Sequence, residues 1–178
     1  MNIPNLLTLL RIILVPGIVI LLMRGSFLYA LILFMVAGIT DGLDGFLARV
    51  LKQQTVLGAY LDPLADKALI ATSFVTLSIL GIIPGWLVVI VISRDFIILF
   101  GFTVLTLMSV PFEISPTYVS KATTVFQIVT IFLALCSRSM EISLCYNLIG
   151  VLFWLTAIAT IISGLYYIYI GIRLVNKT

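Results

Sequence analysis

The stretch from Asp41 to Asp66 reads DGLDGFLARVLKQQTVLGAYLDPLAD, and it holds four of the seven acidic residues in a chain of 178. The sequence on either side is apolar: 62% of all residues are hydrophobic and only 10% are charged. Runs of about 20 apolar residues recur, and each is long enough to cross a hydrocarbon layer about 30 Å thick. Carboxylates at that depth are costly in free energy, so a cluster of them indicates a functional site.

The apolar runs predict an all-α integral membrane protein, with one domain over residues 1–178. A soluble protein with a large core does not account for so many runs of this length. The first run contains Arg11 and lacks a small-residue cleavage site, which favours a retained helix over a cleaved signal peptide. Glycine, proline or charged residues separate the runs. Six transmembrane helices are expected, at about 6–23, 27–51, 59–80, 85–108, 118–135 and 144–173.

The residues that are absent or rare exclude other chemistry. The chain has no histidine, which excludes imidazole zinc sites and a Ser-His-Asp triad. Its two cysteines, Cys136 and Cys145, flank a short polar loop without metal-ligand spacing. Either buried thiols or a disulfide across that loop fits this pattern.

The basic residues at the helix ends predict the orientation in the membrane. An even number of helices places both termini on one side, together with the loops near residues 52–58 and 109–117. The side with more Lys and Arg is expected to be cytoplasmic. That side holds Arg49, Lys52, Lys67, Lys121, Arg173 and Lys177, whereas the other holds Arg24 and Arg138.

The acidic residues are spaced to share helix faces. Asp41 and Asp44 are three apart on one expected helix, and Gly58, Asp62 and Asp66 recur every four residues on the next. If the two faces oppose each other, four carboxylates converge and repel one another unless cations neutralise them. Oxygen ligands suit hard divalent cations, and two of these ions could clamp a phosphoryl displacement. The sequence therefore predicts a divalent metal site.

Two neighbouring residues leave alternatives open. Pro63 either begins a helix that Asp62 caps or kinks a longer helix. Capping accounts for Asp62 alone and leaves the other carboxylates without partners. Lys67 is either a helix-end anchor or a counter-charge to Asp66.

The small and basic residues of the stretch have two readings as well. Gly45 and Gly58 let a nucleotide approach the backbone closely, or they serve tight helix packing. Arg49 either holds phosphate oxygens or anchors the cytoplasmic end of its helix.

The spacing D-x2-D-G-x2-A-R-x8-G-x3-D-x3-D resembles the signature of the CDP-alcohol phosphotransferase family. Eight positions match across 26 residues, and the resemblance covers essentially the whole chain. Family members are membrane enzymes that make phospholipids by displacing CMP from a CDP-linked donor. The resemblance implies that Mg²⁺ or Mn²⁺ is bound, with two ions expected per site. It further implies that Asp41, Asp44 and Asp62 are metal ligands and that Asp66 is both a ligand and the general base.

The resemblance also implies a donor pocket. Residues Asn5, Thr8 and Arg11 form an NxxTxxR pattern that is similar to the family's start of helix one, where such residues approach the nucleotide and phosphates. The donor expected by resemblance is CDP-diacylglycerol, and a homodimer in a bacterial cytoplasmic membrane is expected, with no nucleic-acid partner. The implied CDP-binding residues are Asn5, Thr8, Gly45, Arg49 and Gly58.

The acceptor separates two branches of the family. Phosphatidylglycerophosphate synthases usually carry G-K-x-K-T at the start of helix five, where this chain has Ser120-Lys121-Ala122-Thr123-Thr124. Glycerol 3-phosphate is nearly dianionic and calls for more cations than a phosphodiester does. With Thr123 in place of the second lysine, the remaining candidates for acceptor binding are Arg94 and Lys121. The resemblance therefore favours cardiolipin synthase, with phosphatidylglycerol as acceptor, over the alternative acceptor glycerol 3-phosphate.

Arg94 is followed by Asp95 where the other branch has an Arg-Glu pair. Side chains of adjacent helical residues point about 100° apart. The two residues are therefore expected to find partners on other helices rather than each other.

Two other functions must be weighed. A cation transporter would also use intramembrane carboxylates. The acidic residues argue against it, because they gather towards one face with no matching station deeper in the other helices. A non-catalytic lipid-binding relative is expected to have lost an aspartate, and all four are present.

Overall fold

A computed structural model describes the backbone of residues 3–50, 56–107, 118–140 and 143–175. Side chains are described over most of these ranges, but not for residues 3–9, 43–50, 56–63, 102, 105–106, 118, 140, 143–147 and 175. The described part of the chain is entirely helical apart from short turns. Its six helices are α1 Ile3–Met23, α2 Phe27–Val50, α3 Val56–Ile79, α4 Gly85–Leu107, α5 Tyr118–Met140 and α6 Ser143–Val175.

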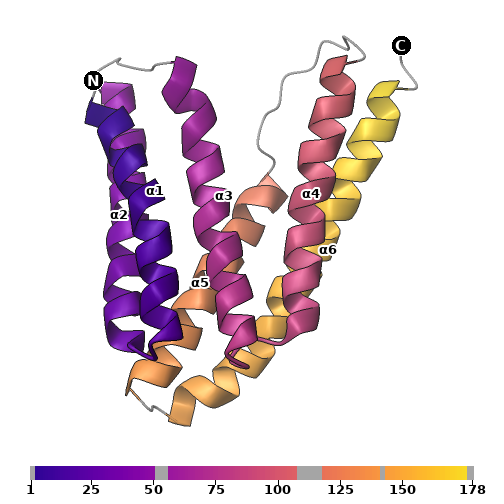
Figure 1. The fold of residues 1–178 in the computed structure, drawn as a ribbon. Helices are drawn as coiled ribbons and strands as arrows, with labels where there is room; N and C mark the ends of the chain where they lie inside the picture. Colours follow the sequence, from indigo (N-terminus) through magenta and orange to yellow (C-terminus); the bar gives the residue numbers. More distant parts are fainter. Residues whose placement is uncertain (1–2, 51–55, 108–117, 141–142, 176–178) are drawn as a thin grey trace.

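The helices form two groups, α1 with α2 and α3, and α4 with α6, and α5 contacts both groups (Figure 1). Helix α1 packs against both α2 and α3, and α4 packs against α3 and α6. Helix α5 contacts α2, α3 and α6, and so connects the groups. The beginning of α1 and the end of α6 lie at the same end of the bundle, as expected when an even number of helices run up and down in turn.

Two glycines end helices at the opposite end of the bundle. Gly25 and Gly81 have φ angles of 72° and 70°, in the left-handed region that residues other than glycine rarely adopt. The Gly25 amide donates to the Leu22 carbonyl oxygen at 2.9 Å, and the Gly81 amide donates to the Ser78 carbonyl oxygen at 2.9 Å. These bonds satisfy helix-end carbonyls and let the chain turn back within a few residues.

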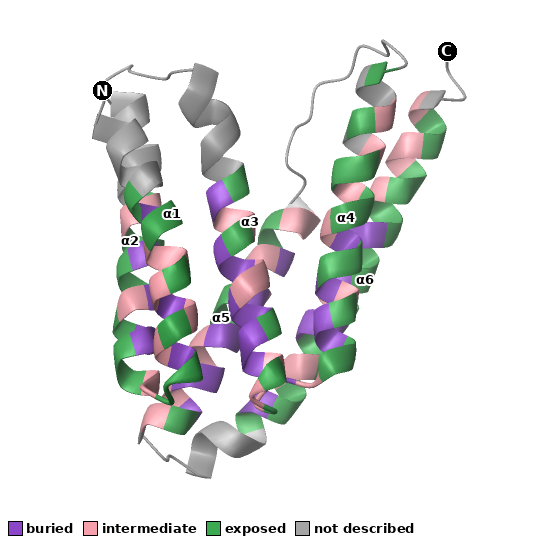
Figure 2. Cartoon of the chain, viewed as in Figure 1, coloured by how far each residue is buried: buried purple, intermediate pink, exposed green. Residues whose placement is uncertain are grey.

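The outer surface of the bundle is apolar, unlike that of a soluble protein, and its interior holds charged residues beside an apolar core. Large apolar side chains such as Phe96, Phe100 and Trp154 are exposed, whereas Arg11 and Arg94 are buried. Figure 2 shows exposed residues along the outer sides of the helices and buried residues on their facing sides. Polar side chains facing inward and apolar ones facing outward are expected where the solvent is lipid. The arrangement is that of a membrane protein.

Length and hydropathy support the same conclusion for part of the bundle. Within the described residues, two segments are long and apolar enough to cross a membrane, Val119–Ser139 in α5 and Leu148–Leu174 in α6. Two shorter apolar segments are Leu10–Met23 and Phe27–Gly42. Six helices are confirmed, while the crossing of the membrane by all six remains a prediction.

The structure decides between the two readings of Pro63. Helix α3 begins at Val56, six residues before Asp62, so both Asp62 and Pro63 lie inside it. The interpretation of Asp62 as the cap of a helix starting at Pro63 is therefore wrong. A longer helix keeps Asp62 and Asp66 four apart on one face, as the metal-site prediction requires.

Candidate functional site

The centre of the site is a buried arginine that joins two carboxylates of the acidic stretch. Arg11 Nη2 lies 2.9 Å from Asp41 Oδ1, and Arg11 Nη1 donates to Asp66 Oδ1 at 2.5 Å. The three residues come from α1, α2 and α3 respectively. Two of the four predicted metal ligands therefore meet at one guanidinium.

The packing of α1 explains how these carboxylates come together. Sequence spacing left open whether the faces of the second and third helices oppose each other, and in the structure α1 packs against both α2 and α3. A guanidinium carries donors on two separate nitrogens in a planar fork, so it can bind two carboxylates at once. Arg11 is thus the link between the two halves of the predicted acidic cluster.

Burial differs sharply across this contact. The Arg11 side chain is 0% exposed, whereas the side chains of Asp41 and Asp66 are 43% and 38% exposed. The guanidinium therefore lies inside the helix packing, and each carboxylate keeps a surface that a ligand can reach.

The remaining residues of the predicted donor and metal sites have only their backbones described. Asp44, Gly45 and Arg49 lie within α2, and Gly58 and Asp62 lie within α3. Their side chains lie outside the described residues, as do those of Asn5 and Thr8 in α1. Of the two cysteines, only the side chain of Cys136 belongs to the described part.

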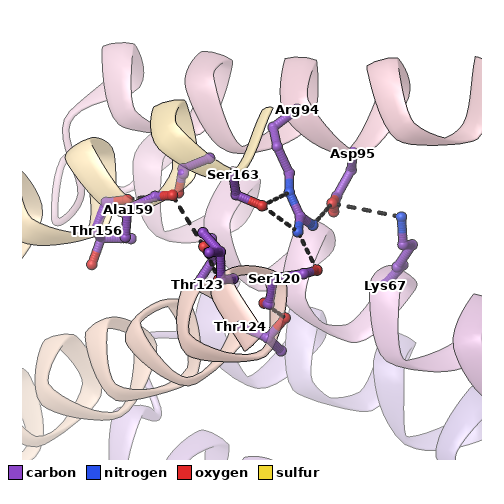
Figure 3. A network of polar contacts seen from close by, with 11 residues as sticks. Lys67, Arg94, Asp95, Ser120, Thr123, Thr124, Thr156, Ala159 and Ser163 are labelled. Carbon is purple, nitrogen blue, oxygen red and sulfur yellow. Dashed lines mark hydrogen bonds and ion pairs between the residues drawn. The ribbon is translucent and has the colours of Figure 1, made fainter. Parts of the chain in front are cut away.

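A second polar network surrounds Arg94, which is 6% exposed (Figure 3). Its Nη2 donates to Ser120 Oγ of α5 at 2.6 Å and to Ser163 Oγ of α6 at 3.0 Å. Its Nε donates to Ser163 Oγ at 3.3 Å, and its guanidinium lies 5.9 Å from the ring centre of Tyr167. Arg94 therefore joins α4 to both α5 and α6.

The expectation that Arg94 and Asp95 do not contact each other is wrong. Arg94 Nη1 donates to Asp95 Oδ1 at 2.7 Å. The directions of adjacent Cα–Cβ bonds differ, but the long arginine side chain reaches back to its neighbour. Lys67 Nζ of α3 lies 3.6 Å from the same Asp95 oxygen, so Lys67 faces Asp95 of α4. This is a partner that neither reading of Lys67 included.

The start of α5 carries the two other residues considered for the acceptor. Lys121 is exposed and follows directly after Ser120, which Arg94 holds. Thr123 is 0% exposed, and its hydroxyl lies 2.9 Å from the Val119 carbonyl oxygen and 3.1 Å from that of Ala159 in α6. The position of the missing second lysine is thus inside the α5–α6 contact.

Comparison with known proteins identifies the family of this chain. The family model described as CDP-alcohol phosphatidyltransferase matches residues 1–162. The chain belongs to the CDP-alcohol phosphatidyltransferase family. The resemblance carried by the acidic stretch is thereby confirmed.

Curated relatives within this family are named for two acceptors. The cardiolipin synthase (CMP-forming) of Rattus norvegicus is 32% identical over 98% of this chain and 63% of its own length. A chloroplastic CDP-diacylglycerol–glycerol-3-phosphate 3-phosphatidyltransferase of Oryza sativa subsp. japonica is 31% identical over 94% of the chain and 56% of its own length. A probable phosphatidylglycerophosphate synthase of Mycobacterium tuberculosis (strain ATCC 25618 / H37Rv) is 40% identical over 60% of the chain and 52% of its own length. The chain thus spans less than two thirds of the length of each of these relatives.

The family is generally dependent on divalent metals, and the described carboxylates fit such an ion. Mg²⁺ and Mn²⁺ prefer carboxylate oxygens. Asp41 and Asp66 offer such oxygens on partly exposed side chains, and each of these carboxylates contacts Arg11 through Oδ1. Within the described side chains there is no group of three or more residues that could hold a metal, and the side chains of Asp44 and Asp62 lie outside that part.

Sequence reasoning underestimated Arg11 and missed the partners of Arg94. In the sequence, Arg11 favours a retained first helix and is the last member of a short N-terminal pattern, but a charged residue inside an apolar helix also needs a partner on another helix. That signal was available in the sequence. Ser120 and Ser163 carried no comparable signal, since serine is common at helix contacts in membranes.

Proposed function

We propose that this protein transfers a phosphatidyl group from CDP-diacylglycerol to a hydroxyl acceptor and releases CMP. The observation that carries the proposal is the meeting of Asp41 and Asp66, from two helices, at Arg11 in a member of this family. The proposed catalytic domain comprises all six helices over residues 1–178. Each helix is proposed to cross the membrane, with both termini and the active site at the cytoplasmic face.

The proposed chemistry is a direct displacement at phosphorus. Asp66 accepts the proton of the acceptor hydroxyl, and the hydroxyl oxygen forms a bond to the lipid-side phosphorus of the donor. The bond from that phosphorus to the CMP oxygen breaks, and CMP leaves with the electron pair. A carboxylate within hydrogen-bond reach of the hydroxyl suits general-base catalysis. No covalent intermediate with the enzyme is required.

The metal ligands proposed are Asp41, Asp44, Asp62 and Asp66, for two ions of Mg²⁺ or Mn²⁺. When bound, such ions neutralise the pyrophosphate and make the phosphorus more electrophilic. Arg11 keeps two of these carboxylates in place through their Oδ1 atoms. The CDP part of the donor is proposed to contact Asn5, Thr8, Gly45, Arg49 and Gly58.

The acceptor side is proposed to lie at Arg94 and Lys121. Arg94 holds Ser120, and the next residue along α5 is the exposed Lys121. The Arg94 guanidinium already binds Asp95 and two serines, which leaves Lys121 as the cation with the larger exposed surface. So small a cationic surface favours a monoanionic phosphodiester. Phosphatidylglycerol is therefore the proposed acceptor, and the product is cardiolipin.

Glycerol 3-phosphate is the second candidate acceptor, because relatives named for both reactions match the chain. The family resemblance supports a homodimer in a bacterial cytoplasmic membrane as the working state.

The deciding experiment offers the purified protein CDP-diacylglycerol with either phosphatidylglycerol or glycerol 3-phosphate, followed by lipid analysis. We expect cardiolipin and an equal amount of CMP from the first pair. Ready formation of phosphatidylglycerophosphate without cardiolipin would replace the acceptor by glycerol 3-phosphate. Formation of neither lipid, and no release of CMP, would refute the proposed activity.

A further inference from the structure

Arg11 has the contacts of a residue that positions the catalytic carboxylates. It binds Asp41 through Nη2 and Asp66 through Nη1, and each contact uses the Oδ1 atom of the carboxylate. One planar guanidinium therefore determines how far apart these two oxygens lie. Since the three residues belong to three helices, the contact also fixes α2 and α3 relative to α1 at this level.

Direct binding of a substrate phosphate by Arg11 does not agree with its burial. The side chain is 0% exposed, and both terminal nitrogens donate to carboxylates. A phosphate would have to displace Asp41 or Asp66 to reach it. The NxxTxxR pattern suggests that Arg11 approaches the nucleotide and its phosphates. In the structure Arg11 is instead buried, and the partly exposed Asp41 and Asp66 contact its two terminal nitrogens.

We propose that Arg11 is a positioning residue, which sets the separation and orientation of Asp41 and Asp66 for metal binding. This inference rests on the proposed function, because it takes both aspartates as metal ligands. Residues that hydrogen-bond to metal ligands orient them, and their loss typically lowers metal affinity by about 10- to 100-fold. Arg11 contacts two of the proposed metal ligands, Asp41 and Asp66.

The sign of the effect separates positioning from simple electrostatics. Removal of a positive charge beside a cation site should tighten cation binding if charge alone matters. Removal of a positioning residue should weaken binding, because the carboxylates must then be ordered when the ion binds. A role in folding alone should leave the affinity of the folded protein unchanged. The three explanations therefore predict three different results.

The experiment measures Mn²⁺ binding to purified protein in detergent by electron paramagnetic resonance. For Arg11→Gln we expect an affinity about 10- to 100-fold weaker than wild type. Arg24→Gln is the matched control: it removes the same charge from an exposed residue just after α1, in the turn at the opposite end of the bundle. That control should bind Mn²⁺ as wild type does.

Arg11→Lys keeps the charge but loses the planar fork that serves two carboxylates. We expect an intermediate affinity, and a higher Mn²⁺ concentration for half-maximal CMP release. This variant carries the test if Arg11→Gln does not yield folded protein. Wild-type Mn²⁺ affinity in Arg11→Lys would then overturn the proposal.

Other outcomes also identify what fails. Equal or tighter Mn²⁺ binding by Arg11→Gln overturns the positioning role and leaves the proposed function standing. Unchanged Mn²⁺ affinity with lost binding of CDP-diacylglycerol shows instead that Arg11 contacts the donor, which overturns the inference. Wild-type protein that binds no Mn²⁺ refutes the metal site of the proposed function, and the inference with it.

Discussion

Replacement of Arg94 by methionine should destabilise the bundle by about 3 kcal/mol. Removal of one member of a buried ion pair typically costs about 3–5 kcal/mol, because it leaves a buried charge without its partner. Here the charge left behind is Asp95, whose side chain is 17% exposed. The Lys67 ammonium, 3.6 Å away, compensates for part of the loss and places the expected cost near the lower value.

The chain provides its own reporter for this measurement. Its only two tryptophans, Trp86 of α4 and Trp154 of α6, have ring centres 5.1 Å apart. Arg94 joins the same two helices through Ser163. Tryptophan fluorescence during unfolding by SDS in mixed micelles should therefore report separation of α4 from α6. Arg138→Met is the matched control, because this exposed arginine should change the free energy of unfolding by less than about 0.5 kcal/mol.

A triple variant tests the physical reason for the loss. Replacement of all members of a buried ion-pair group by apolar residues is often neutral or stabilising. Asp95 also contacts Lys67, so the variant that leaves no charge without its partner is Arg94→Met with Asp95→Leu and Lys67→Met, and it should be more stable than Arg94→Met alone. The reasoning is refuted if Arg94→Met unfolds as wild type does, or if the triple variant is less stable than Arg94→Met.

Three further predictions concern activity. CMP release should require Mg²⁺ or Mn²⁺ and stop with a chelator, and Asp41→Asn should abolish turnover in folded protein; undiminished turnover at limiting metal would remove Asp41 from the site. Asp66→Asn should lower the rate by about 10²-fold or more while CDP-diacylglycerol still binds, because the amide keeps an oxygen but cannot act as the base. Equal losses of rate and donor binding would make Asp66 mainly a ligand. Lys121→Ala should raise the KM for the acceptor more than that for the donor, whereas an unchanged acceptor KM would exclude Lys121.

The six helices could be predicted from the sequence because their signals are local. Each apolar run ends at a glycine, proline or charged residue, and the turns at Gly25 and Gly81 fall where such breaks were expected. The start of α3 does not follow from the sequence, since Pro63 is compatible with either a first turn or an interior position. The helix begins at Val56, so Pro63 lies in its interior.

The contacts within the candidate site were only partly predictable. Spacing placed Asp41 and Asp66 on helices that could bring them together, but it did not reveal that Arg11 on a third helix joins them. Side-chain length also mattered, as Arg94 reaches back to Asp95 despite their diverging bonds. Burial of Thr123 against α6 depends on the α5–α6 contact, which residue type alone does not specify.

The two polar networks meet at consecutive residues of α3. Asp66 binds Arg11, which also holds Asp41 of α2, and the next residue, Lys67, faces Asp95 of α4. Asp95 in turn binds Arg94, which reaches Ser120 of α5 and Ser163 of α6. All six helices thus contribute to these two networks, which adjoin at α3. The proposed base Asp66 lies on α3, and Lys67 of the same helix contacts Asp95, which binds the proposed acceptor residue Arg94. Loss of the Lys67–Asp95 contact should therefore affect acceptor use more than metal binding, because the contacts of Arg11 with Asp41 and Asp66 involve neither Lys67 nor Asp95.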